Sequence, residues 1–179
     1  VFSVLEFMGM SKIFLRKSRI LQFLTNLIFI LYIFYFCSVI LIFSFSFSIK
    51  ILIFLILLTC VASDIGGFVF GKIIKGPKLT KISPNKTIAG SIGSLIFSSL
   101  LAFILIYFFT KSYDPKVIII GFITSFGCQI GDLLFSFFKR KSFLKDTGSF
   151  LPGHGGILDR IDGMLVGIPL GFLSLLIIY

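Results

Sequence analysis

The chain has 179 residues, of which 57% are hydrophobic and 13% are charged, and its mean hydropathy is +1.12. Soluble domains have about 45–50% apolar and about 25% charged residues, so this composition excludes an ordinary soluble domain and indicates an integral membrane protein. The net charge is +10, but no basic tail or nucleic-acid-binding motif accompanies it. The charge therefore points to membrane topology and anionic ligands, and no nucleic acid is expected as a partner.

Five apolar runs are long enough to cross a bilayer, since a spanning helix needs about 20 residues. They cover residues 20–43, 51–70, 91–110, 117–138 and 161–179. The basic segment 1–19 precedes a run too long for a signal-peptide core, so the first run is expected to be a membrane anchor. Residues 43–48 alternate Phe and Ser, but a lone strand cannot exist in lipid, which predicts a helix end or a short outer loop. The sequence thus predicts an all-α polytopic membrane protein with about five transmembrane helices, forming one domain over residues 1–179.

The basic residues predict the orientation of these spans. Segments 1–19, 71–90 and 139–160 hold fourteen of the seventeen Lys and Arg residues, and Lys50, Lys111 and Lys116 make up the rest. Cytoplasmic loops are enriched in Lys and Arg, so the three rich segments are expected inside. Both polar loops then face the cytoplasm. We expect a bacterial-type inner (plasma) membrane protein whose active site lies on the cytoplasmic face.

The first polar loop, residues 71–90, carries five lysines and no acid. Its Ser-Pro-Asn-Lys-Thr segment, residues 83–87, could start a helix and direct hydroxyls, N–H groups and an ammonium at a phosphate. Two carboxylates lie within the neighbouring apolar runs, Asp64 and Asp132. Carboxylates at such depth are functional candidates, although Asp64 could instead be a helix-terminal acid paired with a loop lysine.

The second polar stretch, residues 136–162, concentrates five basic residues, three acidic residues and the single histidine. Its dense cationic patch can neutralise phosphate and consists of Lys139, Arg140, Lys141 and Lys145. The Pro-Gly-His-Gly-Gly segment 152–156 can bring backbone N–H groups close to an anion. Asp159 and Asp162 are three apart, so a helix places both on one face, where they suit a hard cation such as Mg²⁺. The combination predicts phosphoryl or nucleotidyl transfer, whereas a basic loop alone would be only a topology signal.

This stretch resembles the signature of the phosphatidate cytidylyltransferase family, also called CDP-diglyceride synthetases. The matching residues are Ser136, Lys139-Arg140, Lys145-Asp146, Pro152, His154-Gly155-Gly156 and Asp159-Arg160-Ile161-Asp162. An upstream family motif is matched by Asp64, Gly71-Lys72, Ser83-Pro84, Lys86-Thr87 and Gly90. A match over this many positions is specific, and it marks residues 63–162 as the catalytic region.

The resemblance implies transfer of CMP from CTP to phosphatidate, a membrane lipid, giving CDP-diacylglycerol and pyrophosphate. Catalytic roles are expected for Asp132, Asp159, Lys145, His154 and Arg160. Substrate-binding roles are expected for Ser83, Lys86, Thr87, Ser136, Lys139, Arg140, Gly155 and Gly156. The expected cofactor is Mg²⁺, with a second cation left open, and its candidate ligands are Asp64, Asp132, Asp159 and Asp162. His154 either donates to a phosphate or locks the glycine loop.

Two positions depart from the family pattern. A glutamate usually precedes the signature serine and often precedes the glycine after Lys-Thr, but this chain has Phe135 and Ala89. The alternatives are a related CTP-dependent polyprenol kinase, an ether-lipid cytidylyltransferase, and a non-catalytic membrane scaffold or transporter. A CDP-alcohol phosphotransferase is disfavoured, because its Asp-Gly-x-x-Ala-Arg motif fails after Asp162-Gly163.

Two further expectations follow from the apolar runs. Polar groups inside small membrane proteins favour association, so a homodimer is expected. Cys37, Cys60 and Cys128 share no metal-ligand spacing, which predicts that they are small buried hydrophobic residues.

Overall fold

A computed structural model of the protein describes residues 1–111, 113–148, 150 and 155–178. The helices of the described part are α1 (Phe2–Phe14), α2 (Arg19–Phe43), α3 (Phe47–Ile74), α4 (Ile88–Thr110), α5 (Lys116–Lys141) and α6 (Leu158–Ile178). No strand forms within these residues, and Lys78 and Thr87 make an isolated antiparallel bridge. The expected all-α fold is confirmed.

Helices α2 to α6 are long and apolar enough to cross a membrane, and they coincide with the five expected spans. The outward surfaces of these helices carry large apolar side chains; on α2, Phe23 is 67% exposed and Phe34 is 72% exposed. Such surfaces are stable in lipid and not in water. The protein is therefore an integral membrane protein, and residues 44–46 form the short connection expected after the first span.

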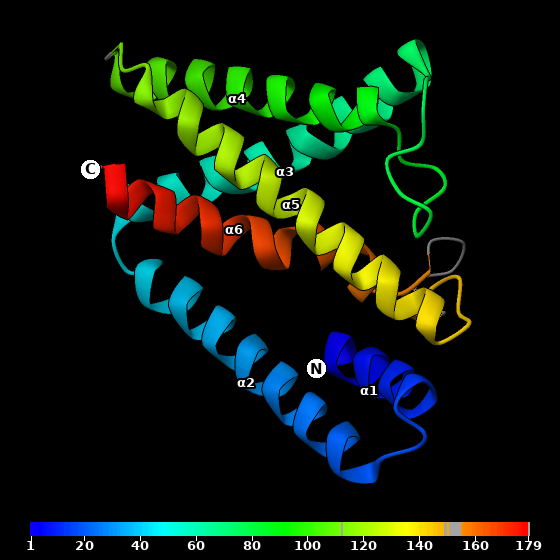
Figure 1. The fold of residues 1–179 in the computed structure, drawn as a ribbon. Coiled ribbons are helices and arrows are strands. Elements are labelled where there is room, and N and C mark those ends of the chain that lie inside the picture. The colour runs from blue at the N-terminus through cyan, green and yellow to red at the C-terminus, as the bar shows by residue number, and fades with distance from the viewer. Residues whose placement is uncertain (112, 149, 151–154, 179) are drawn as a thin grey trace.

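The N-terminal segment is a helix that the sequence analysis did not predict. Helix α1 packs against α2, α5 and α6 through a buried apolar cluster that includes Phe7 and Met10. Its partners in that cluster are Phe29, Phe135, Leu158 and Leu165. Figure 1 shows α1 beside the end of α5 that leads into the second polar loop. This helix therefore belongs to the same end of the molecule as the signature residues.

Glycines set the closest helix crossings. A Cβ on Gly131 of α5 would lie 2.5 Å from the carbonyl oxygen of Asp162 in α6. A Cβ on Gly90 of α4 would lie 2.7 Å from the carbonyl oxygen of Gly67 in α3. Small residues at such crossings let helix backbones touch in a membrane. The first crossing puts Asp132 beside α6, and the second puts the start of α4 against α3.

The helices leave both polar loops at one end of the bundle, opposite the last turn of α6 and the α2–α3 connection (Figure 1). Helix α2 stands apart from α4 and α5, and its Tyr32 hydroxyl donates to the carbonyl oxygen of Leu165. Cys60 and Cys128 are buried in a second apolar cluster, as expected. The expectation was wrong for Cys37, which is exposed because α2 turns most of its surface outward.

Candidate active site

A pocket of about 190 Å³ lies between α3, the loop over residues 75–87, α4 and α5. A single water needs about 10–15 Å³ on the same measure, so the pocket has room for a phosphate group and its waters. The expected site residues that line it are Asp64, Lys86, Thr87 and Asp132. The structure therefore brings residues of the first polar loop together with the two carboxylates of the neighbouring spans.

The loop before α4 folds back as a narrow hairpin. The Leu79 N–H donates to the carbonyl of Lys86 at 2.8 Å, and the Ile88 N–H donates to the carbonyl of Pro77 at 3.1 Å. The hairpin delivers Lys86 and Thr87 to the pocket rim. The Thr87 hydroxyl oxygen accepts from the Gly90 N–H at 3.0 Å and so caps α4, at the end of the 83–87 segment that was expected to start a helix. A helix N-terminus with a neighbouring lysine favours an anion.

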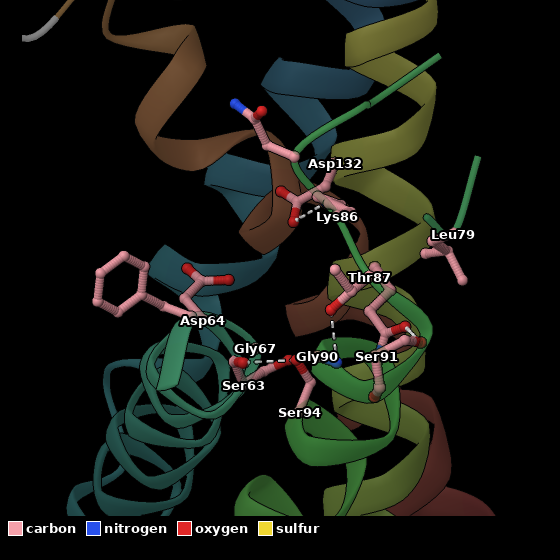
Figure 2. A pocket seen from close by; sticks show the side chains of 13 residues that line it. Ser63, Asp64, Gly67, Leu79, Lys86, Thr87, Gly90, Ser91, Ser94 and Asp132 are labelled. Carbon is pink, nitrogen blue, oxygen red and sulfur yellow. Dashed lines mark hydrogen bonds and ion pairs between the residues drawn. The ribbon is translucent and has the colours of Figure 1, made fainter. Parts of the chain in front are cut away.

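Opposite charges face each other across the pocket. Lys86 Nζ lies 2.6 Å from Asp132 Oδ2, and both side chains are partly exposed to the pocket, at 31% and 23%. Asp64 lies on the α3 side, across from this ion pair, and its charge interacts with both partners (Figure 2). The loop lysine thus pairs with Asp132 rather than with Asp64, contrary to the alternative reading of Asp64.

The pocket floor consists of polar residues that the sequence analysis missed. Gln129 Nε2 donates to the carbonyl of Ser91 at 3.1 Å, and the Ser91 hydroxyl donates to Gln129 Oε1. The Ser94 hydroxyl donates to the carbonyl of Ser63 at 2.7 Å. These bonds fix α3, α4 and α5 relative to one another beneath the carboxylates. An amide side chain inside an apolar run was the signal that could have revealed Gln129.

Lys139 connects the pocket to the signature loop. Its Nζ lies 2.8 Å from Asp159 Oδ1 and 3.7 Å from Asp162 Oδ2, so the two aspartates share one face of α6 as expected. The three side chains are between 10% and 14% exposed. Asp162 is also near enough to Asp132 for the two carboxyl charges to act on each other, and a Cβ on the adjacent Gly163 would lie 2.8 Å from Asp132 Oδ1. An ionic chain therefore runs from Lys86 through Asp132 and Asp162 to Lys139 and Asp159.

Asp159 holds the signature loop. Its Oδ2 accepts hydrogen bonds from the Thr147 N–H at 2.8 Å, the Thr147 hydroxyl at 3.0 Å and the Gly156 N–H at 3.0 Å. Gly155 has φ +79°, and a Cβ there would lie 3.1 Å from the same oxygen. Only glycine accepts this backbone without strain. Gly155 and Gly156 therefore shape the loop around Asp159.

The four candidate metal ligands do not form one cluster. Asp64, Asp132 and Asp162 lie at or beside the pocket, whereas Asp159 is occupied by the loop and Lys139. Among the described residues, no group of three or more Asp, Glu, His or Cys side chains is arranged to hold a metal ion. The role of Asp159 as a metal ligand stays a prediction.

The donors nevertheless fit a hard cation at the pocket. The charges of Asp132 and Asp162 act on each other, and Asp64 adds its negative charge from the opposite wall. Two neighbouring carboxylates repel each other unless a proton or cation compensates them. Carboxylate oxygens beside a phosphate-sized pocket are the ligands that Mg²⁺ prefers.

Other expected site residues lie around this centre. Ser136 and Arg140 follow Asp132 at intervals of four residues, so they continue its face along α5. Arg140 Nε donates to the carbonyl of Ile82 at 3.4 Å, which ties α5 to the hairpin. Ser83 acts through its backbone, since its carbonyl accepts from the Lys86 N–H at 3.1 Å.

Among the described residues, Lys145 and Arg160 are expected site residues that do not line the pocket. Lys145 and Arg160 are exposed near the signature loop. His154 lies outside the described residues. Roles for these three in binding or catalysis stay predictions.

The two departures from the family pattern do not face the pocket. Phe135 is 4% exposed and packs edge-on against Phe29 and Phe138, so its side chain lies under α1 and α2. Ala89 lies in the first turn of α4 and is not among the residues that line the pocket. The carboxylates around the pocket are thus unaffected by either replacement.

Together, the bundle and its pocket define a polytopic membrane protein with a polar, phosphate-sized site at one end of its helices. The sequence model of the cytidylyltransferase family matches residues 1–178, and the chain belongs to this family. It is 42% identical over 110 residues to the phosphatidate cytidylyltransferase of Staphylococcus haemolyticus, covering 60% of this chain and 42% of that protein. It is 38% identical over 121 residues to the phosphatidate cytidylyltransferase of Helicobacter pylori, covering 68% and 45%. The chain thus spans less than half the length of these relatives.

Proposed function

We propose that this protein transfers CMP from CTP to phosphatidate, giving CDP-diacylglycerol and pyrophosphate. The observation that carries the proposal is the pocket at one end of the bundle, where Lys86 and the N-terminus of α4 face the carboxylates of Asp64 and Asp132. The names of the relatives support the same reaction.

The reaction brings two anions together, so neutralising charge is the main task of the site. An oxygen of the lipid phosphate attacks the α-phosphorus of CTP, the bond from that phosphorus to the bridging oxygen breaks, and pyrophosphate leaves. Lys86, Thr87 and the first-turn N–H groups of α4 form the side of the pocket suited to phosphate oxygens. Lys139 and Arg140 lie on the approach from α5.

Asp132 and Asp162, with Asp64 across the pocket, would hold Mg²⁺. When bound, this cation would neutralise negative charge on the phosphate oxygens, both around the attacked phosphorus and on the departing pyrophosphate. Asp159 orients the signature loop and keeps Lys139 beside Asp162.

Labelling CTP at two different positions tests the reaction. Purified protein in vesicles that contain both phosphatidate and a polyprenol is given CTP labelled at either the α- or the γ-phosphorus. Transfer of CMP puts only the α-label into lipid and releases one pyrophosphate for each lipid product. A related CTP-dependent kinase would put only the γ-label into lipid. Lipid that gains neither label would favour the scaffold or transporter reading.

A matched pair of lysine variants ties the activity to the pocket. Lys86→Met removes the pocket ammonium, whereas Lys81→Met changes an exposed lysine of the same hairpin. The proposal expects incorporation to collapse in the first variant only. Equal activity in both would detach the reaction from this pocket.

We also propose that the pocket end of the bundle faces the cytoplasm, where CTP is available. The biased distribution of Lys and Arg supports this orientation. The homodimer is likewise a proposal, and the outward-facing apolar surface of α2 is where a second copy could pack. Native mass spectrometry from lipid nanodiscs measures whether the protein is a monomer or a dimer.

A further inference from the structure

Glu6 of helix α1 contacts the signature region across most of the chain length. Its Oε1 accepts from the Ile157 N–H at 3.0 Å, and its Oε2 accepts from the Leu158 N–H at 2.7 Å. These two N–H groups belong to the start of α6, where the first backbone donors have no partner within the helix. A carboxylate there satisfies them and complements the positive end of the helix dipole.

The same carboxylate shares a partner with Asp159. The Thr147 hydroxyl oxygen lies 3.2 Å from Glu6 Oε2 and 3.0 Å from Asp159 Oδ2, so its proton serves one acid or the other. The Gly156 N–H donates to Asp159 from the position beside Ile157. Glu6 and Asp159 therefore accept hydrogen bonds from neighbouring residues of the same loop.

The loop backbone lies directly on the Glu6 side chain. A Cβ on Gly148 would lie 2.8 Å from Glu6 Oε1, and a Cβ on Gly156 would lie 2.7 Å from Oε2. No larger residue fits these positions without moving the loop or the carboxylate. Because the loop backbone packs so closely on it, the Glu6 carboxylate has less freedom to move than a carboxylate in an exposed surface ion pair.

Helix α1 is itself anchored, so Glu6 can act as a fixed support. Phe7 is 3% exposed and Met10 is fully buried in the apolar cluster beneath α5 and α6. The Ser142 hydroxyl, just after α5, donates to the carbonyl of Met10 at 3.1 Å. Helix α1 thus contacts both the beginning and the end of the signature loop.

We infer that Glu6 is a positioning residue for the transferase site. By holding the start of α6 it keeps Asp159 on the loop and Asp162 beside Asp132, without touching substrate. The inference about turnover rests on the proposed function. The inference about loop order does not, because hydrogen exchange measures it without substrate.

Glu6→Gln is the decisive variant, because the amide nitrogen cannot accept the second backbone N–H and the charge is lost. Without ligand, exchange of the Ile157 and Leu158 amides should rise about tenfold or more, the factor expected for one lost charge-assisted hydrogen bond. Turnover at saturating CTP should fall by a similar factor. Glu6→Asp keeps the charge on a shorter side chain and should recover part of both effects.

Ser11→Ala is the matched control on the same helix. It removes the 2.7 Å bond from the Ser11 hydroxyl to Asn26 and so loosens α1 from α2 without touching the loop. Exchange at Ile157 and Leu158, and turnover, should stay at wild-type values. If Ser11→Ala reproduced the Glu6→Gln effects at an equal loss of thermal stability, Glu6 would be only a packing residue.

Two results would overturn the positioning role outright. One is a Glu6→Gln protein whose amides at positions 157 and 158 exchange at the wild-type rate. The other is loosened amides with unchanged turnover in a protein that is shown to transfer CMP. If the wild-type protein transfers no CMP, the proposed function fails, and the exchange ratio alone decides whether Glu6 holds the loop.

Discussion

Asp132 and Asp162 are the residues whose placement is hardest to explain by packing alone. Their charges act on each other within a mostly apolar bundle, and each also contacts a lysine. Charged groups at this depth are costly and are retained for function more often than for stability. The lysines lower that cost, because each places a positive charge beside one of the two carboxylates.

Changing these carboxylates to amides tests the site at the residue scale. Asp132→Asn and Asp162→Asn should each lower turnover at saturating Mg²⁺ by at least about 10²-fold, the usual effect of losing one strong electrostatic contact in a transition state. The double variant should be little worse than either single one, because residues that act as a unit are not additive. Incorporation of α-labelled CTP into lipid measures all three.

Asp114→Asn is the control for that series. Asp114 lies at the opposite end of the bundle, where its Oδ1 accepts from the Lys116 N–H at 2.9 Å, and an amide oxygen can keep that bond. The turnover of the Asp114→Asn protein should equal that of the wild type. A wild-type rate in Asp132→Asn would refute the carboxylate site.

At the scale of the helices, the α5–α6 crossing decides whether the carboxylates meet. Gly131 precedes Asp132, and the chain of α6 passes so close that a methyl group has no room. Gly131→Ala should therefore separate the two helices and destabilise the protein by about 1–3 kcal/mol, the usual cost of overpacking. Thermal unfolding in detergent and turnover should both show the loss.

Gly9→Ala is the control for Gly131→Ala, because it makes the same substitution in a helix where the added methyl has room. A Cβ on Gly9 meets nothing within 4 Å, so the added methyl should only favour α1, by up to about 1 kcal/mol. If Gly131→Ala were equally harmless, close backbone contact would not be what aligns the carboxylates.

The elements show why sequence alone predicted some features and missed others. The five spans and a helix start at the end of residues 83–87 were predictable, because apolar length and capping hydroxyls act locally. The Lys86–Asp132 pair joins residues 46 positions apart, and sequence indicated only that both were candidates. Helix α1 was missed because its weak polar–apolar pattern gains stability from packing under α5 and α6. The role of Glu6 depends on a contact made 151 residues away, which no local pattern encodes.

At the scale of the whole molecule, the arrangement of the loops predicts which residues are reachable from each side of the membrane. Single cysteines replacing Lys81 and Lys145 should react with a membrane-impermeant thiol reagent from the cytoplasmic side only. A cysteine replacing Lys111, at the other end of α4, should react from the opposite side. The increase in protein mass after labelling in oriented vesicles shows whether each cysteine has reacted. Labelling of Lys81→Cys and Lys111→Cys from one side would exclude the five-span arrangement.

The ion pairs also have an order in time, because a ribosome makes the chain from its N-terminus. Lys86 is synthesised 46 residues before Asp132, and Lys139 is synthesised 20 residues before Asp159. In both pairs the cation has therefore been made before the acid enters the bilayer. Helix α5, which carries Asp132, is also the least apolar of the five spans. An acid that meets a waiting lysine need not remain uncompensated in lipid, so the order of the residues along the chain itself eases insertion of this site into the membrane.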